Sequence, residues 1–449
     1  MRSTSKSRIR RLATGRLISV TGGAAAFTAL NFTVWERTHS PGMQALSLLL
    51  TFGVAGILGP FAGVLGDRYD RRWVMVWSEA VGAALFLAMA VVVDLGTTGL
   101  LIALAFGAAI AEQPFFSSSR AAIPNLIDDP EDLNWANSLV TIGVHAGIAI
   151  GPVLGGVLYE AIGPSAVFAL NAVSFVLSLI LTLTVHGDFQ ADRSGATHDE
   201  HQGIAAGLRF LWRDPALRRM STAWFIFVLG LSVGMVADAA LAESFGMEAI
   251  GYAMMITAWG LGSVLGSASG RWLPPGREGT SMVAGAFGIS IFSMIVGVAP
   301  VFWLVLVALF LFGACDGVTI VAENTIMQTR TPDEVRSRTN AGFEAVLSIG
   351  LAAGYLMAGP VLGVVSPQGA YRIGAVGACI AAIWLLPLRA LDHGRGGTPR
   401  DGTGRPEADP EAEADGAATT VEPAVPGSIV SFTSAEALEA EPAPLDRSA

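Results

Sequence analysis

The chain has 449 residues, of which 52% are hydrophobic and 14% are charged, and its mean hydropathy is +0.55. Soluble domains carry about 25% charged residues, so most of this chain is excluded from water. A single lysine, Lys6, leaves no G-K-[ST] phosphate-binding motif, which argues against ATP-driven chemistry. Outside residues 391–449, which hold 12 of the 37 acids and 4 of the 27 bases, the net charge is −2 (25 acids, 23 bases), and no basic face favours nucleic acid.

Twelve apolar stretches are long enough to cross a bilayer, whose hydrocarbon core of about 30 Å takes roughly 20 residues per helix. The sequence therefore predicts an all-α membrane protein with 12 transmembrane helices. Residues 1–13 are interpreted as a cytosolic N-terminal flank, because no small-residue cleavage site of a signal peptide follows them. The predicted spans are residues 14–36, 44–64, 73–94, 98–118, 135–159, 163–185, 217–240, 248–270, 280–299, 302–325, 339–365 and 370–390.

The distribution of arginine and lysine predicts the orientation, because cytoplasmic loops carry the excess of these residues. With the N-terminus in the cytosol, only Arg37 and Arg372 fall outside, and the other 25 bases fall inside. We therefore expect a multi-pass protein of the cell (inner) membrane with both termini in the cytoplasm.

The chain divides into two similar halves. GPVLGG at residues 151–156 recurs as GPVLGV at residues 359–364, and the loops PEDLNWAN and PDEVRSRTN precede the two copies. Three such pairs in the same order, including Ala-Glu before Arg, indicate a duplicated six-helix unit. The sequence thus predicts an N-terminal lobe at residues 14–185 and a C-terminal lobe at residues 217–390.

Two segments are too polar to cross a membrane. Residues 186–216 are predicted to be a cytoplasmic loop containing an interfacial amphipathic helix. Residues 391–449 are rich in Gly, Pro, Ala, Glu and Asp and are predicted to be a disordered acidic cytoplasmic tail. The His-Asp-Glu-His run at residues 198–201 is interpreted as a solvated charge run, and Cys315 and Cys379 lie far apart. We expect no metal site and no cofactor.

The loop between the second and third spans reads GVLGDRYDRR at residues 63–72. This G-x-L-x-D-R-x-x-R-R pattern resembles the signature loop of the major facilitator superfamily, at its usual place. The resemblance implies a gating loop whose acid faces a helix N-terminus or pairs with an arginine. A plainer interpretation is that the arginines only anchor the loop in the cytosol. The gating residues would be Gly63, Gly66, Asp67, Arg68, Arg71 and Arg72.

The fifth span carries a complete G-x-x-x-G-P-x-x-G-G pattern, which resembles the antiporter motif that the superfamily associates with exporters. Small residues at this spacing permit close backbone packing, and the proline kinks the helix. The alternative is a general small-residue packing face without directional meaning. The motif residues are Gly147, Gly151, Pro152, Gly155 and Gly156.

The segment GIAAGLRFLWRDPALRR at residues 203–219 and the loop at residues 332–338 are similar to the branch of the superfamily that contains macrolide-type drug exporters and enterobactin-type siderophore exporters. This resemblance covers residues 12–390. It implies the major facilitator fold, with two six-helix pseudo-repeats, and a transporter rather than an enzyme. We expect a monomeric, proton-coupled antiporter in the lipid bilayer that exports a small amphiphilic organic compound, a drug or natural product, by alternating access. The alternatives are a siderophore or endogenous metabolite exporter and a non-transporting membrane receptor.

Acidic residues inside predicted spans are candidates for function, because charges in hydrocarbon are costly. A carboxyl removed from water favours its protonated form, so it can bind a proton in one conformation and release it in another. Glu112 and Glu323 lie about two turns from the cytoplasmic Arg120 and Arg330, and in an alternative interpretation they only lock helices. The predicted proton-coupling or substrate residues are Asp316, Glu112, Glu323 and Glu79.

Several aromatic and amide residues lie on the spans expected to line the central cavity, where they would suit an apolar substrate. The same residues can face lipid or the core, and the sequence does not separate these positions. The cavity candidates are Phe27, Asn31, Phe115, Trp224 and Phe227.

Overall fold

The computed structural model describes residues 5–58, 65, 68–129, 132–190, 203–269 and 276–392. Within these ranges the chain forms helices and no strands. Eleven of the helical segments are long and apolar enough to cross a membrane. One of them, α6 (Leu133–Thr184), is two helices that meet at Gly163, where φ is 81° and ψ is 167°. The described residues therefore hold twelve crossing segments, which confirms the predicted all-α membrane fold.

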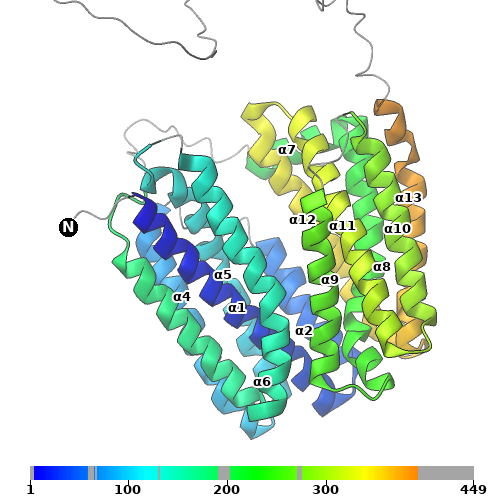
Figure 1. The fold of residues 1–449 in the computed structure, drawn as a ribbon, viewed down its shortest axis with the longest axis horizontal. Helices are drawn as coiled ribbons and strands as arrows, with labels where there is room; N and C mark the ends of the chain where they lie inside the picture. The colour runs from blue at the N-terminus through cyan, green and yellow to red at the C-terminus, as the bar shows by residue number, and fades with distance from the viewer. Residues whose placement is uncertain are drawn as a thin grey trace, which may run out of the picture. The chain divides into compact units, whose positions relative to one another are not determined.

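The helices follow the predicted spans in order and are labelled in Figure 1. Their bounds are α1 (Ser5–Thr38), α2 (Pro41–Leu48) with the π-helical η1 (Leu49–Val54), α4 (Arg71–Val92) with the 3₁₀ turn η2 (Val93–Leu95), α5 (Thr98–Leu126), α6, α7 (Gly203–Arg213), α8 (Pro215–Ser244), α9 (Ala249–Ser269), α10 (Glu278–Val298), α11 (Phe302–Arg330), α12 (Asp333–Leu362), α13 (Pro367–Leu385) and the 3₁₀ segment η6 (Leu386–Leu391).

Helix α1 begins at Ser5, nine residues before the predicted start of its span. The added turns are held by packing, because Ile9 and Leu12 are buried at 0% and 2% exposure among residues of α4, α5 and α6. Nearby, Arg8 Nη2 lies 2.9 Å from Asp128 Oδ1, just after the end of α5. The residues taken as a cytosolic flank therefore extend the first helix.

The two halves, α1–α6 and α8–α13, contact each other at the end of the helix bundle opposite to α7 (Figure 1). At this end Trp35 Nε1 of α1 donates to Glu243 Oε2 of α8 at 2.6 Å, and Glu160 Oε1 of α6 accepts from the backbone N–H of Ile250 at 2.9 Å. One apolar cluster joins residues of both halves there, including Ala29 of the first half and Tyr252 of the second. The halves also meet where α12 packs on α2 and η1.

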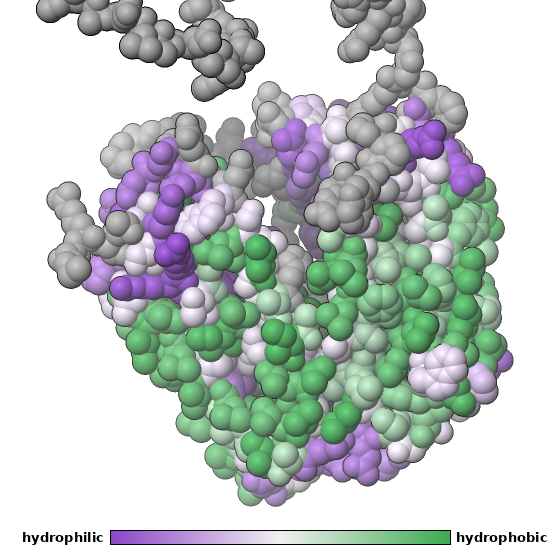
Figure 2. Space-filling model, in the orientation of Figure 1, coloured by the Kyte–Doolittle hydropathy of each residue, from purple (hydrophilic) through white to green (hydrophobic). Residues whose placement is uncertain are grey.

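The lateral surface of the molecule is apolar. Figure 2 shows a broad hydrophobic band between two hydrophilic ends. On α13 the exposed side chains Ile373, Val376, Ile380 and Ile383 form one stripe along the helix. Such a stripe suits contact with lipid chains rather than water.

Candidate functional site

A buried charge cluster lies inside the N-terminal half. Arg16 of α1 is 3% exposed and Glu79 of α4 is 1% exposed. Arg16 interacts electrostatically with Glu79 and with Glu112 of α5. Ser178 Oγ of α6 donates to Glu79 Oε1 at 2.7 Å. Four helices of one half therefore meet at this group of charges.

The cluster contains polar atoms without hydrogen-bond partners. Arg16 Nε and Glu79 Oε2 are buried and have no hydrogen-bond partner within the described ranges. The Arg16 guanidinium instead lies over two rings of α5, 4.5 Å from the centroid of Phe116 and 5.2 Å from that of Phe115. A buried unpaired polar group costs about 1–3 kcal/mol, and functional sites are among the places where proteins retain such groups.

The C-terminal half carries a second acidic group. Asp316 of α11 is 6% exposed, and Glu323 lies seven residues further on, which places both on one face of the helix. Glu323 interacts electrostatically with Asp316 and with Glu344 of α12. Glu323 is therefore repelled by one carboxyl of its own helix and by the exposed Glu344 of α12.

Arg120 connects the two groups. This exposed residue of α5 interacts electrostatically with Arg16 in its own half and with Glu344 in the other half. A chain of interacting charges therefore runs from Glu79 in the first half to Asp316 in the second. A movement of one half against the other would change the distance between Arg120 and Glu344, and with it the electrostatic energy of the chain.

The G-x-x-x-G-P-x-x-G-G segment packs on two different helices. A Cβ atom at Gly147 or Gly151 would lie 2.9 Å from Val20 Cγ1 or 2.5 Å from Ala24 Cβ, both on α1. One at Gly155 would lie 2.7 Å from Ala25 Cα. Gly156 instead faces the other half, where an added Cβ would lie 2.6 Å from Ala253 Cβ of α9. Pro152 is buried in the same helix.

Of the predicted gating loop, Gly63, Gly66 and Asp67 lie outside the described residues. Arg71 Nη1 donates to Ala121 O of α5 at 2.9 Å, and Arg72 Nη2 donates to Leu183 O of α6 at 2.6 Å. Leu183 O lies in the last turn of α6, where cations are stabilising, and Ala121 O lies five residues before the end of α5. The two arginines therefore tie the start of α4 to its neighbours, while Arg68 lies over the ring of Tyr69.

The cavity candidates of the first half occupy two places. Phe27 meets Phe52 edge-on, with ring centroids 5.1 Å apart, beside apolar residues from both halves. Asn31 is buried, and its Oδ1 accepts from Gln44 Nε2 at 2.9 Å. Phe115 lies under Arg16. Phe27 thus lies between the halves, and Phe115 is part of the charge cluster.

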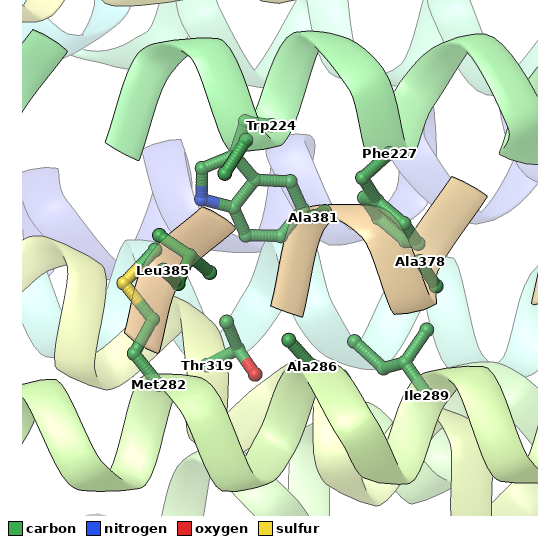
Figure 3. A pocket seen from close by; sticks show the side chains of 10 residues that line it. Trp224, Phe227, Met282, Ala286, Ile289, Thr319, Ala378, Ala381 and Leu385 are labelled. Carbon is green, nitrogen blue, oxygen red and sulfur yellow. The ribbon is translucent and has the colours of Figure 1, made fainter. Parts of the chain in front are cut away.

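The two candidates of the second half lie in its core. Trp224 and Phe227 of α8 pack edge-on, with ring centroids 5.1 Å apart. They line a small apolar cavity of about 20 Å³ between α8, α10, α11 and α13, together with Thr319 of α11 (Figure 3). A cavity of that size holds about one water molecule, so it is a packing gap rather than a space for an organic substrate.

Sequence comparison gives the family of the chain. A family model described as transmembrane secretion effector matches residues 6–399. The chain belongs to this family of major facilitator transporters. This transporter is similar to the enterobactin exporter EntS of Shigella boydii serotype 18, with 26% identity over 379 residues that cover 83% of the chain and 89% of the exporter. EntS of Escherichia coli O1:K1 matches to the same extent.

Solved structures show the same fold. The nucleoside transporter NupG superposes with a TM-score of 0.65 at 15% identity, covering 86% of this transporter and 99% of NupG. A bacterial homologue of the iron transporter ferroportin, in an inward-facing state, gives a TM-score of 0.61 at 17% identity, covering 85% and 99% of the two chains. The predicted major facilitator fold is therefore confirmed.

Three members of the charge chain in this transporter, Arg16, Arg120 and Glu344, were not among the predicted site residues. Arg120 lies two residues beyond the predicted span at residues 98–118. Arg16 and Glu344 both lie inside predicted spans, at residues 14–36 and 339–365. A charged side chain inside a membrane span is costly and is therefore a candidate for function. This reasoning points to Glu344, which is an acid, and it applies equally to Arg16. The signal was therefore present for both residues.

Proposed function

We propose that this transporter is a proton-coupled antiporter that exports a small amphiphilic organic compound by alternating access. The charge chain that links the two halves carries the proposal, because Glu79 and Asp316 are buried inside crossing helices and the two ends of the chain belong to different halves, which alternating access would move relative to each other. The similarity to an exporter supports the direction of transport.

In the proposed orientation, both termini lie in the cytosol of a bacterial cell. We further propose that the transporter lies in the inner membrane as a monomer. The contacts of Trp35 with Glu243 and of Glu160 with Ile250 then lie at the outer end. The conformation would be closed toward the outside. Asp67 and the adjacent arginines would control the cytoplasmic gate, and the glycines of α6 would permit the halves to rock.

In this mechanism Asp316, Glu323 and Glu344 bind protons that arrive from outside, and release them when the halves return to the conformation described here. Binding relieves the repulsion among the three carboxyls. Release is favoured when Arg120 approaches Glu344, because a nearby cation stabilises the ionised form. In the first half, Arg16 supplies the counter-charge for Glu79 and Glu112.

Proteoliposome flux with an imposed pH gradient tests the proposal. We expect a fluorescent amphiphilic substrate to accumulate in vesicles with an acidic interior, because protons leave as substrate enters. Asp316→Asn should abolish accumulation while retaining exchange of internal for external substrate, which requires no net proton movement. Asp94→Asn, an exposed acid after α4, is the matched control and should keep full accumulation. Flux that ignores the gradient in the unmodified protein would refute antiport.

A second candidate substrate class is favoured by the match to an enterobactin exporter. The same vesicles distinguish it from a drug-like class. Accumulation of enterobactin, without accumulation of apolar dyes, would assign the transporter to siderophore export. The reverse result would assign it to the export of drug-like compounds.

A further inference from the structure

A surface pocket lies on the C-terminal half at the end that carries α7. Its volume is about 330 Å³, and its lining residues come from three helices. They are Trp212 of α7, Arg218, Arg219 and Thr222 of α8, and Trp384 of α13. The proposed charge chain includes none of them.

The pocket is cationic. Arg218 is exposed, and the Arg219 guanidinium lies 5.8 Å from the ring centroid of Trp384. Among the residues that the structure describes, no acid lines the pocket. The neighbouring acid Asp214 is engaged elsewhere, because its Oδ2 accepts from Arg330 Nη1 at 3.0 Å and its Oδ1 caps the first turn of α8. Two guanidinium groups are thus available to an anion.

The pocket lies where the apolar lateral surface ends. The exposed stripe of α13 passes through Ile380 and Ile383 and reaches Trp384, which is 46% exposed. Trp212 is 44% exposed on the adjacent α7. Indole rings favour the level of the lipid headgroups, where one edge is apolar and the other meets water. The pocket therefore lies at headgroup depth, directly beyond a surface suited to acyl chains.

We propose that this pocket binds the headgroup of an anionic phospholipid. The phosphate contacts Arg218 and Arg219, whose planar guanidinium groups bind phosphate oxygens in pairs. The acyl chains lie along the α13 stripe, and the two indoles flank the glycerol region. Basic pockets at the cytoplasmic side of transmembrane helices recognise lipid headgroups in this way. The orientation proposed above places the lipid in the inner leaflet.

Native mass spectrometry of the full-length protein tests the site. The purified chain is titrated with phosphatidylglycerol, with phosphatidylcholine of the same acyl chains, and with inorganic phosphate. We expect preferential retention of phosphatidylglycerol, and a weakening of its apparent Kd by about tenfold or more in Arg218→Gln/Arg219→Gln, since each lost contact is charge-assisted. Arg209→Gln, an exposed arginine of α7 outside the pocket, should leave the Kd unchanged.

Arg218→Lys/Arg219→Lys provides a second measurement if the glutamine variant fails to fold. It keeps the charge but removes the paired geometry, so we expect an intermediate Kd with the preference for phosphatidylglycerol retained. Equal retention of both lipids would overturn the proposal. So would an equal loss in Arg209→Gln, which would indicate diffuse surface attraction, or full displacement of the lipid by millimolar phosphate, which would indicate a simple anion site.

Discussion

Arg16 is the residue on which the N-terminal charge cluster depends. Its guanidinium is 3% exposed, and the acids with which it interacts lie on two neighbouring helices. Removing one partner of a buried ion pair is much more harmful than replacing both, because the remaining charge stays buried without compensation. The cluster is therefore a set of mutually dependent side chains rather than a sum of independent ones.

Arg16→Gln should destabilise the protein by about 3–5 kcal/mol, whereas Arg16→Gln/Glu79→Gln should recover part of that loss. Thermal unfolding in detergent, followed by intrinsic tryptophan fluorescence, measures both variants. Arg120→Gln is the control, since Arg120 is exposed and its loss should change the melting temperature little. Strictly additive effects of the two substitutions would show that Arg16 and Glu79 do not interact.

The sequence places four of the acids inside predicted spans but does not give their partners. Hydropathy places Glu79, Glu112, Asp316 and Glu323 inside spans, because a charge interrupts an apolar run. The contact between Glu79 and Ser178 joins residues 99 positions apart and depends on how α4 rotates against α6. The rotation of α4 against α6 cannot be predicted from a single sequence.

At the scale of the helices, the glycine face of α6 determines how closely the first half can pack. Its glycines leave no space for a side chain between α6 and α1, and the next residue along, Gly156, faces α9. The i, i+4, i+8 spacing predicts a close contact, but the identity of the facing helix follows only from the fold. Gly155 faces α1 and the next residue, Gly156, faces α9, and the motif alone does not predict this difference.

Gly151→Ala should lower stability by about 1–3 kcal/mol, because the added methyl group would overlap Ala24 Cβ and Thr21 O in a rigid helix pair. Gly260→Ala is the matched control. It is also a buried glycine within a helix, but an added Cβ there meets no atom within 4 Å. Melting temperatures of the two variants check the difference. Equal tolerance would mean that α1 moves aside at little cost.

At the scale of the whole transporter, the two halves are connected at one end by specific polar contacts. Trp35 donates across the boundary to Glu243, and Glu160 accepts from the first turn of α9. These contacts join residues near helix ends, so their loss should change the equilibrium between conformations rather than the fold. Charge counting gives the predicted orientation, but it gives no information about which conformation the chain favours.

Trp35→Phe should shift the transporter toward a conformation that is open at this end, because the indole donor is lost while the aromatic packing remains. Distances between spin labels at positions 37 and 248, one in each half, measure the change by electron–electron double resonance after Cys315 and Cys379 are replaced. We expect a new population at longer distance. Gln368→Ala, which removes a hydrogen bond to Ser244 within one half, should leave the distribution unchanged. A similar change in both variants would contradict a specific role for Trp35.

Gly163 has a mechanical consequence for this movement. The two arms of α6 are separated by a single residue of non-helical backbone, which spans only about 3.8 Å between neighbouring Cα atoms. The fifth and sixth crossings are consequently joined almost directly at Gly163, with no loop between them. In the proposed rocking movement, the helix of α6 that contacts α9 through Gly156 would therefore carry the other helix of α6 with it.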